Sequence, residues 1–229
     1  MLNRFIPFLV FAVIFAIPAC GTPAKYTNRP VPLCEGRQAE VRLNGVPYTM
    51  TGNNTCAAAI SPFDLSVWNE AVLNSRPIRG LREISIGCKP LTAATDNCSY
   101  CGVTGHSNTI MMNFDPTVYS DDTTVRRAVL AVHSPNNPRG LVGAQLRGRL
   151  TVGDELVSLA RGREAIIPTG SKTGEGWAFF DVTNFVARAI NERRNSIHFE
   201  ISLPCQTPAN NLVDVSVARQ EPRLVVEFF

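Results

Sequence analysis

Hydrophobic and polar side chains alternate along most of the second half of the chain, from residue 106 onward. The hydrophobic positions of the clearest runs are Ile110, Met112 and Phe114; Ala128, Leu130 and Val132; Leu146, Leu150 and Val152; Ile197, Phe199 and Ile201; Val213, Val215 and Val217; and Leu224, Val226 and Phe228. Successive side chains of a strand point to opposite faces, so each run predicts a strand with one buried and one polar face. Short strands at this spacing predict an all-β fold: an antiparallel, jelly-roll-like sandwich with one or two short helices.

One segment within this half changes to a helical period. Its hydrophobic positions fall on one stripe and are Phe185, Val186, Ala189 and Ile190. Asp181 and Thr183 stand just before this stripe, where a side-chain oxygen accepts a hydrogen bond from an unpaired N–H group of the first turn. We therefore predict a short helix here, with Asp181 or Thr183 as its structural cap.

A second short helix is predicted near residue 61. Ser61-Pro62 precedes a group of hydrophobic side chains, and proline is favoured in the first turn of a helix. The hydrophobic positions that suggest this helix are Phe63, Leu65, Trp68 and Val72.

The N-terminus has the features of a bacterial lipoprotein leader. Arg4 precedes an uncharged run from Phe5 to Ile17, which is shorter than the roughly 20 residues that cross a bilayer. Ile17-Pro18-Ala19-Cys20 then matches a lipobox, in which the cysteine is acylated and becomes the new N-terminus. Plain secretion or an uncleaved anchor is the alternative. We expect Cys20 to carry lipid, and Gly21, rather than the aspartate of an inner-membrane retention signal, favours the outer membrane.

These boundaries divide the chain into three parts. Residues 1–19 form the signal peptide, residues 20–33 a proline-containing lipidated tether, and residues 34–229 a single β-sandwich domain with a cysteine-rich insertion at about 44–105. Removal of the leader takes away Arg4 and leaves 21 basic and 19 acidic side chains, a net charge of +2. That charge is too balanced to predict nucleic acid as a partner. The expected partner through the N-terminal lipid is a membrane of the cell envelope.

Six cysteines remain once Cys20 is assigned to lipid. They are Cys34, Cys56, Cys88, Cys98, Cys101 and Cys205. An even number of cysteines in an oxidising compartment predicts three disulfides, with fifteen possible connectivities. Five of the six lie between residues 34 and 101, so Cys205 must pair with that segment if all six are oxidised. The predicted sandwich is therefore braced by disulfides.

A metal site is the weaker alternative for part of this set. Cys98 and Cys101 form a CxxC pair, and Cys88 and His106 flank it, so the four could supply tetrahedral zinc ligands. Redox chemistry at the CxxC pair is a further alternative, although the helix and βαβ pattern of a redox motif are missing. Separately, the adjacent carboxylates Asp121 and Asp122 make calcium possible, and turn propensity explains them equally well.

The order of these phrases resembles the DNRLRE domain, a β-sandwich also classed as carbohydrate-binding module family 96. The phrases that carry the resemblance are Ile84-Ser85-Ile86-Gly87, residues 110–115, residues 125–132, Phe180-Asp181-Val182-Thr183 and Leu224-Val225-Val226-Glu227. The resemblance covers roughly residues 38–229, and it implies a sandwich that binds polysaccharide. The chain departs from the family pattern in its cysteine-rich insertion, in the absence of a tryptophan in the helix and in the absence of a catalytic module.

The sequence does not predict an enzyme. It contains no nucleophile elbow, no HExxH zinc motif and no phosphate-binding loop. Its histidines, His106, His133 and His198, fall on a predicted loop, a strand end and an outward strand face, where a catalytic role is not expected.

Two functions remain as hypotheses. The first is a glycan-binding lipoprotein, with Trp68, Tyr100 and Tyr119 as the rings on which a sugar would stack. The second is a structural or adhesion subunit that docks protein partners at the cell envelope. Glycan binding requires exposed aromatic rings grouped with arginine, asparagine or aspartate on one face. Docking requires an apolar patch of several hundred Å² or an unpaired edge strand.

Overall fold

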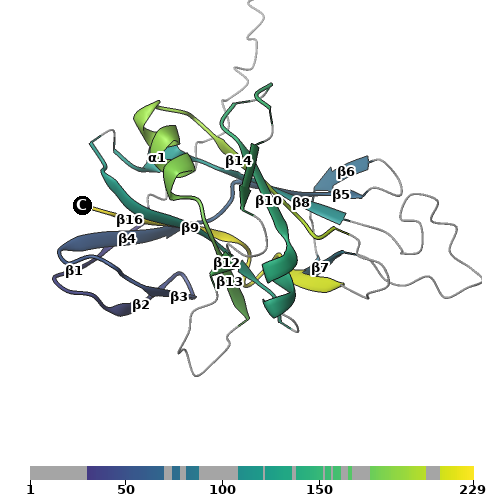
Figure 1. Cartoon of the computed structure of the whole chain (residues 1–229), viewed down its shortest axis with the longest axis horizontal. Coiled ribbons are helices and arrows are strands. Elements are labelled where there is room, and N and C mark those ends of the chain that lie inside the picture. The colour runs from purple at the N-terminus through teal and green to yellow at the C-terminus, as the bar shows by residue number, and fades with distance from the viewer. Residues whose placement is uncertain are drawn as a thin grey trace, which may run out of the picture.

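The computed structural model describes residues 30–69, 74–77, 81–87, 108–120, 122–135, 138–151, 153–155, 157–160, 165–166, 176–204 and 212–229. Within these residues two six-stranded antiparallel sheets pack face to face (Figure 1). Successive strands pass repeatedly from one sheet to the other, as in jelly-roll sandwiches. The predicted all-β sandwich is confirmed.

The first sheet, sheet I, contains both ends of the described chain. Its strands, in spatial order, are β1 (Leu33–Glu35), β4 (Thr55–Ile60), β16 (Arg223–Phe228), β9 (Val125–His133), β13 (Trp177–Asp181) and β12 (Ala165–Ile166). The second sheet, sheet II, has the order β11 (Val157–Ala160), β10 (Gln145–Arg149), β14 (Ile197–Ser202), β8 (Asn108–Phe114), β5 (Asp64–Asn69) and β6 (Asn74–Pro77). A separate pair, β7 (Glu83–Ile86) and β15 (Val213–Ser216), packs beside them. Two 3-10 turns lie at Pro116–Val118 and Pro138–Gly143.

The main core lies between the two sheets. The alternating residues predicted to face inward are buried there: Phe114 and Phe199 from sheet II meet edge to face with ring centroids 5.9 Å apart. Leu130 and Leu224 are cross-strand partners in sheet I, and both belong to the same core. Each such side chain contributes about 1.5–3 kcal/mol when fully buried. The alternation of hydrophobic and polar residues in the sequence thus reflects the packing of the two sheets against each other.

A third layer covers the outer face of sheet I. The hairpin of β2 (Glu40–Leu43) and β3 (Val46–Thr49) turns at Asn44-Gly45, where both residues have the positive φ of a two-residue hairpin turn. Its side chains form a second buried cluster with Val129, Ala131 and Val225. The central strands of sheet I, β4, β16, β9 and β13, are consequently buried on both faces along most of their length, which corrects the prediction that each strand keeps one polar face.

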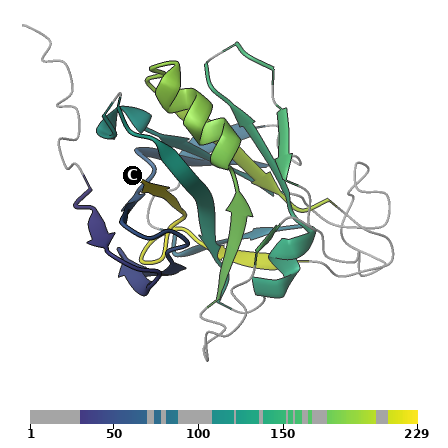
Figure 2. The same ribbon diagram turned by 60° about the vertical axis from the view of Figure 1, so that its left-hand side comes forward.

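Helix α1 (Thr183–Asn191) closes one end of the sandwich between the sheets (Figure 2). Val186, Ala189 and Ile190 are buried, and the ring of Phe185 lies 5.8 Å from that of Phe199 on β14. The predicted helical stripe is therefore the surface that packs on the core, and it contacts elements of both sheets.

The start of α1 is fixed by the two residues predicted to cap it. The N-cap position itself is Val182, which has no side-chain cap. Asp181 Oδ1 accepts a hydrogen bond from the N–H of Thr183 at 2.9 Å. The Thr183 hydroxyl accepts one from the N–H of Ala128 on β9 at 3.0 Å. Asp181 thus satisfies the helix N–H, and Thr183 ties the helix to sheet I.

Two predictions about residues 44–105 need correction. The segment after Ser61-Pro62 is not a helix but strand β5, in which Leu65 and Val67 face the core. Nor is this region wholly an insertion outside the sandwich, because β4 lies between β1 and β16 and β5 pairs with β8. Residues 44–69 therefore supply strands to both sheets.

One disulfide lies within the described residues. Cys34 on β1 and Cys56 on β4 are cross-strand partners, bonded with their Cα atoms 4.0 Å apart. The bond fastens edge strand β1 to the rest of sheet I. Cys20, Cys88, Cys98, Cys101, Cys205 and His106 all lie outside the described residues. If the four later cysteines also pair, Cys205 joins Cys88, Cys98 or Cys101, and three connectivities remain.

The described part of the chain has no helix long and apolar enough to cross a membrane.

Candidate functional site

The outward face of sheet II, here called the polar face, groups charged and polar side chains with one tryptophan. Register places its residues in three rows across β5, β8, β14 and β10. The rows are Asp64, Asn113, His198 and Arg149; Ser66, Met111, Glu200 and Arg147; and Trp68, Thr109, Ser202 and Gln145. With usual strand and residue spacings, this face measures about 14 Å in each direction. Four strands from distant parts of the sequence thus build one continuous surface.

Trp68 is the aromatic member of this face. Leu65 and Val67 pack into the core, so alternation along β5 directs Trp68 to the other side, where its side chain is half-buried. The next residue across the sheet is Thr109 on β8, followed by Ser202 on β14. A partly exposed indole beside hydroxyl-bearing side chains offers both an apolar platform and hydrogen-bonding groups.

A chain of polar contacts crosses the first two rows. The amide Nδ2 of Asn113 donates to Asp64 Oδ2 at 3.0 Å. The same side chain's Oδ1 lies 2.9 Å from His198 Nδ1, and His198 Nε2 lies 3.1 Å from Glu200 Oε1. His198 is 8% exposed, although it stands on the face predicted to be solvent-facing. The four side chains hold one another in place across β5, β8 and β14.

Glu200 is the anionic centre of the polar face. The hydrogen bond from His198 lowers the pKa of its carboxyl group, burial raises that pKa, and the charges of His198, Arg149 and Arg147 lower it further. The net pKa lies below the ordinary value, so Glu200 is a carboxylate at neutral pH. Arg147 is its cross-strand partner and is exposed, while Arg149 is half-buried. The face therefore presents carboxylate, imidazole and guanidinium groups side by side.

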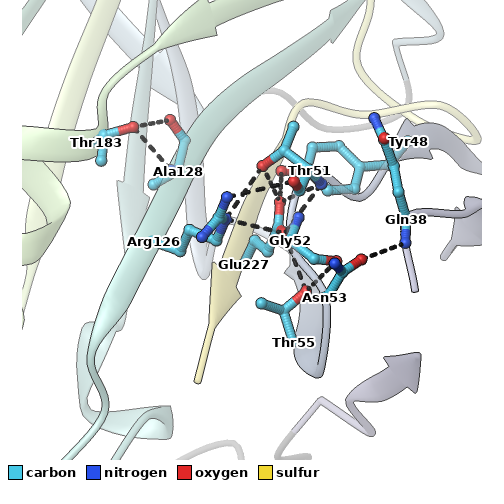
Figure 3. Close-up of polar contacts among 10 residues, drawn as sticks. All are labelled: Gln38, Tyr48, Thr51, Gly52, Asn53, Thr55, Arg126, Ala128, Thr183 and Glu227. Carbon is cyan, nitrogen blue, oxygen red and sulfur yellow. Dashed lines mark hydrogen bonds and ion pairs between the residues drawn. The ribbon is translucent and has the colours of Figure 1, made fainter. Parts of the chain in front are cut away.

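A second polar cluster surrounds Glu227 on β16 of sheet I (Figure 3). Its carboxylate is fully buried and accepts hydrogen bonds from the Gly52 N–H at 2.7 Å and the Thr51 N–H at 3.0 Å. The hydroxyls of Tyr48, Thr51 and Thr55 donate to it at 2.9, 3.0 and 3.0 Å. Every accepting position of this carboxylate is thus directed at the chain itself.

The Glu227 cluster consequently holds the end of the β2–β3 hairpin on sheet I. Gly52 is required in it, because a Cβ there would lie 2.4 Å from Thr55 Cγ2 and 2.9 Å from Arg126 Cδ. Arg126 Nε lies 3.7 Å from Glu227 Oε1, and its Nη2 donates to the Thr51 carbonyl. We assign this cluster a structural role.

An open cavity of about 870 Å³ adjoins this cluster and the start of α1. Its wall includes Arg126, Arg127, Asp181 and Asn184. Three of these side chains already serve the fold: Arg126 binds Thr51, Arg127 lies over the ring of Tyr48, and Asp181 holds the helix N–H. The polar face is for this reason the better candidate site.

The three predicted stacking rings have different positions. Trp68 lies on the polar face. Tyr119 is a core residue, 8% exposed, with its ring edge to face against Phe228, which corrects its prediction as a ligand-stacking ring. Burial raises the pKa of its hydroxyl. Tyr100 lies outside the described residues.

The remaining predictions concern metals and histidines. Asp122 is exposed, whereas Asp121 and the suggested zinc ligands lie outside the described residues. Within the described ranges, no three histidine, cysteine or acidic side chains are grouped to hold a metal ion. His133 is buried beside Trp177, and its Nδ1 lies 2.8 Å from Ser216 Oγ.

Asn113, His198 and Glu200 were not predicted as site residues. The alternation marks each as outward-facing, but only the strand register shows that they are neighbours. No protein-family model matches this chain, and no curated protein is significantly similar to it.

Proposed function

We propose that this chain is a non-catalytic envelope lipoprotein whose β-sandwich binds glycan on the polar face. The observation that carries the proposal is the cross-strand grouping of Trp68 with Asp64, Asn113, Arg147 and Arg149 on one face of sheet II. Glycan binding calls for an aromatic ring grouped in this way with arginine, asparagine and aspartate side chains, and the half-buried Trp68 is the ring on this face. The resemblance to the DNRLRE domain supports the same class of ligand, and the lipobox at Cys20 supports delivery to the envelope.

Each group on the face suits one part of a sugar. The indole of Trp68 can cover the C–H face of a pyranose ring, which is apolar. Arginine, carboxylate and amide side chains supply donors and acceptors for ring hydroxyls, and the fork of Arg147 also fits a carboxylate or sulfate substituent. The contacts among Asp64, Asn113, His198 and Glu200 fix several of these groups before any ligand arrives. Such preorganisation lowers the entropy cost of binding.

The experiment is a saccharide array with the oxidised domain of residues 34–229, followed by calorimetric titration of the saccharides that bind. Trp68→Ala should weaken binding at least tenfold, about 1.4 kcal/mol, because the aromatic anchor of the polar face is lost. The matched control is Phe229→Ala, which removes a 60% exposed aromatic ring on sheet I. This control should bind like the unaltered protein.

Two results would count against the proposal. Binding that survives Trp68→Ala but is lost on Phe229→Ala would move the site away from the polar face. If no saccharide binds on the array, the proposed glycan binding is refuted. That result would favour the alternative, a structural or adhesion subunit that docks protein partners.

A further inference from the structure

His198 has a hydrogen-bond environment that a neutral imidazole cannot satisfy. The Asp64 carboxylate can only accept, so it fixes the Asn113 amide with Nδ2 toward Asp64 and Oδ1 toward His198. Nδ1 of His198 therefore faces an acceptor and must donate. Nε2 faces the Glu200 carboxylate, which is a second acceptor, at 3.1 Å. Both ring nitrogens donate only in the imidazolium form.

The charged groups around His198 come from two neighbouring strands, β5 and β10, and from Glu200 on its own strand β14. Asp64 on β5 contacts Asn113 on β8, which in turn contacts Nδ1 of His198, and Glu200 lies at Nε2. Arg149 on β10 is the cross-strand partner of His198, and Arg147 is the partner of Glu200. Of these charged groups, Glu200 contacts the ring directly, at 3.1 Å.

Loss of one proton from His198 breaks one of its two contacts, and the structure indicates which. If Nδ1 loses the proton, Asn113 must turn its Oδ1 toward Asp64, which places two acceptors together. If Nε2 loses it, only Glu200 is left without a donor, and Glu200 has Arg147 as its cross-strand partner. The second rearrangement is less costly, because Glu200 has arginine donors on the neighbouring strand β10.

We propose that His198 controls ligand binding on the polar face through its protonation. As an imidazolium it holds Glu200 and leaves the guanidinium groups of Arg147 and Arg149 to the ligand. Once His198 is neutral, Glu200 turns to these arginines and competes with the ligand for their N–H groups. Binding then weakens as the pH rises and the imidazolium gives up its proton. The binding part of this inference rests on the proposed function.

A ligand-free NMR titration tests the switch by itself. The ring signals of His198 and the Nε–H signals of Arg147 and Arg149 are followed together from about pH 5 to about pH 8.5. The arginine signals should move with the same midpoint as those of His198, and they should stay constant in His198→Gln. If the arginine signals do not change together with the ring signals of His198, the proposed switch is refuted.

A second variant keeps the histidine and removes the constraint on Asn113. In Asp64→Asn, the amide of Asn113 is free to turn and donate to a neutral His198, so Nε2–H stays on Glu200. The response of the arginine signals should shrink in this variant. Glu155→Gln, which changes an exposed carboxylate outside this chain of polar contacts, should leave the response intact. An undiminished response in Asp64→Asn would contradict the role given to Asp64.

Affinity for a saccharide that binds on the array is then measured at both ends of the pH range. The switch predicts affinity about tenfold weaker at the alkaline end, with most of this difference lost in His198→Gln. Equal affinities would refute control by His198 and leave the proposed function intact. Coupled NMR signals without binding of any saccharide would refute the proposed function and leave the switch intact.

Discussion

Replacement of Glu227 by glutamine tests whether a single buried carboxylate fastens the β2–β3 hairpin to sheet I. Glutamine has nearly the same shape, but one of its terminal atoms is a donor. The amide nitrogen cannot take the Oε1 position, because the Gly52 N–H points there at 2.7 Å. It takes the Oε2 position, where the hydroxyls of Tyr48 and Thr51 can turn and accept, while the Thr51 N–H, which is shared between both oxygens, moves wholly to Oε1. The change therefore mainly removes the charge.

The expected loss follows from the bonds that remain. Three donors stay on the remaining oxygen: the N–H groups of Thr51 and Gly52 and the Thr55 hydroxyl. A hydrogen bond to a charged group stabilises by about 1 kcal/mol more than one to a neutral group, so these three weaken by about 3 kcal/mol together. A loss of this size is a large part of the 5–15 kcal/mol that keeps a typical domain folded.

The dependence of this effect on pH has a definite sign. Burial raises the pKa of Glu227, but the N–H groups of Thr51 and Gly52 and the hydroxyls of Tyr48 and Thr51 together lower it below 4.5, its ordinary value. A lowered pKa in the folded state stabilises the fold above pH 4.5, and this contribution is lost as the pH falls through the folded-state pKa. The difference between the parent and Glu227→Gln should therefore shrink below pH 4.5.

The assay is urea unfolding of the oxidised domain at pH 7 and in steps down to acid pH. The matched control is Glu155→Gln, which changes an exposed carboxylate and should shift the free energy of unfolding by no more than about 0.5 kcal/mol. The reasoning is refuted if Glu227→Gln costs no more than this control, or if its effect grows as the pH falls.

Three further changes test other parts of the account. Asp181→Ala should lower the free energy of unfolding by about 0.5–2 kcal/mol, because Asp181 accepts the hydrogen bond of the Thr183 N–H. Glycan affinity should stay unchanged. Loss of binding at an unchanged melting temperature would instead indicate a functional role for Asp181. Loss of the Cys34–Cys56 bond in a double serine variant should cost about 3 kcal/mol for its loop, measured by urea unfolding, and an unchanged midpoint would contradict this. Cys20→Ser should block lipid attachment and release the protein from membranes, so normal membrane association of this variant would end the lipoprotein interpretation.

The strands that the sequence predicts well are those with one buried face. Ile110, Met112 and Phe114 alternate with polar residues because β8 packs on the core on one side only. Strand β4, by contrast, reads Thr-Cys-Ala-Ala-Ala-Ile and shows no alternation, because the hairpin covers its second face. The Asn44-Gly45 pair was an available signal for that hairpin, since this dipeptide favours a two-residue turn.

The error at β5 has a similar origin. Leu65, Trp68 and Val72 fit a helical spacing, and Ser61-Pro62 resembles a helix start. Val67 distinguishes a strand from a helix here, because Val67 and Leu65 share a face only in a structure with a two-residue period. The residue type of Trp68 was enough to select it as a ligand-stacking candidate. Its neighbours depend on the register between β5, β8 and β14, which short-range sequence patterns do not determine.

NMR mapping of a bound saccharide tests the central claim, glycan binding on the polar face, most directly. Saccharides from the array are titrated into isotope-labelled domain, and amide and side-chain signals are followed residue by residue. The largest changes should fall on Trp68, Asn113, Glu200 and Arg147, and the region of Arg126, Asn184 and Glu227 should stay unchanged. Changes centred on Arg126 and Asn184 instead, at the cavity beside α1, would contradict it.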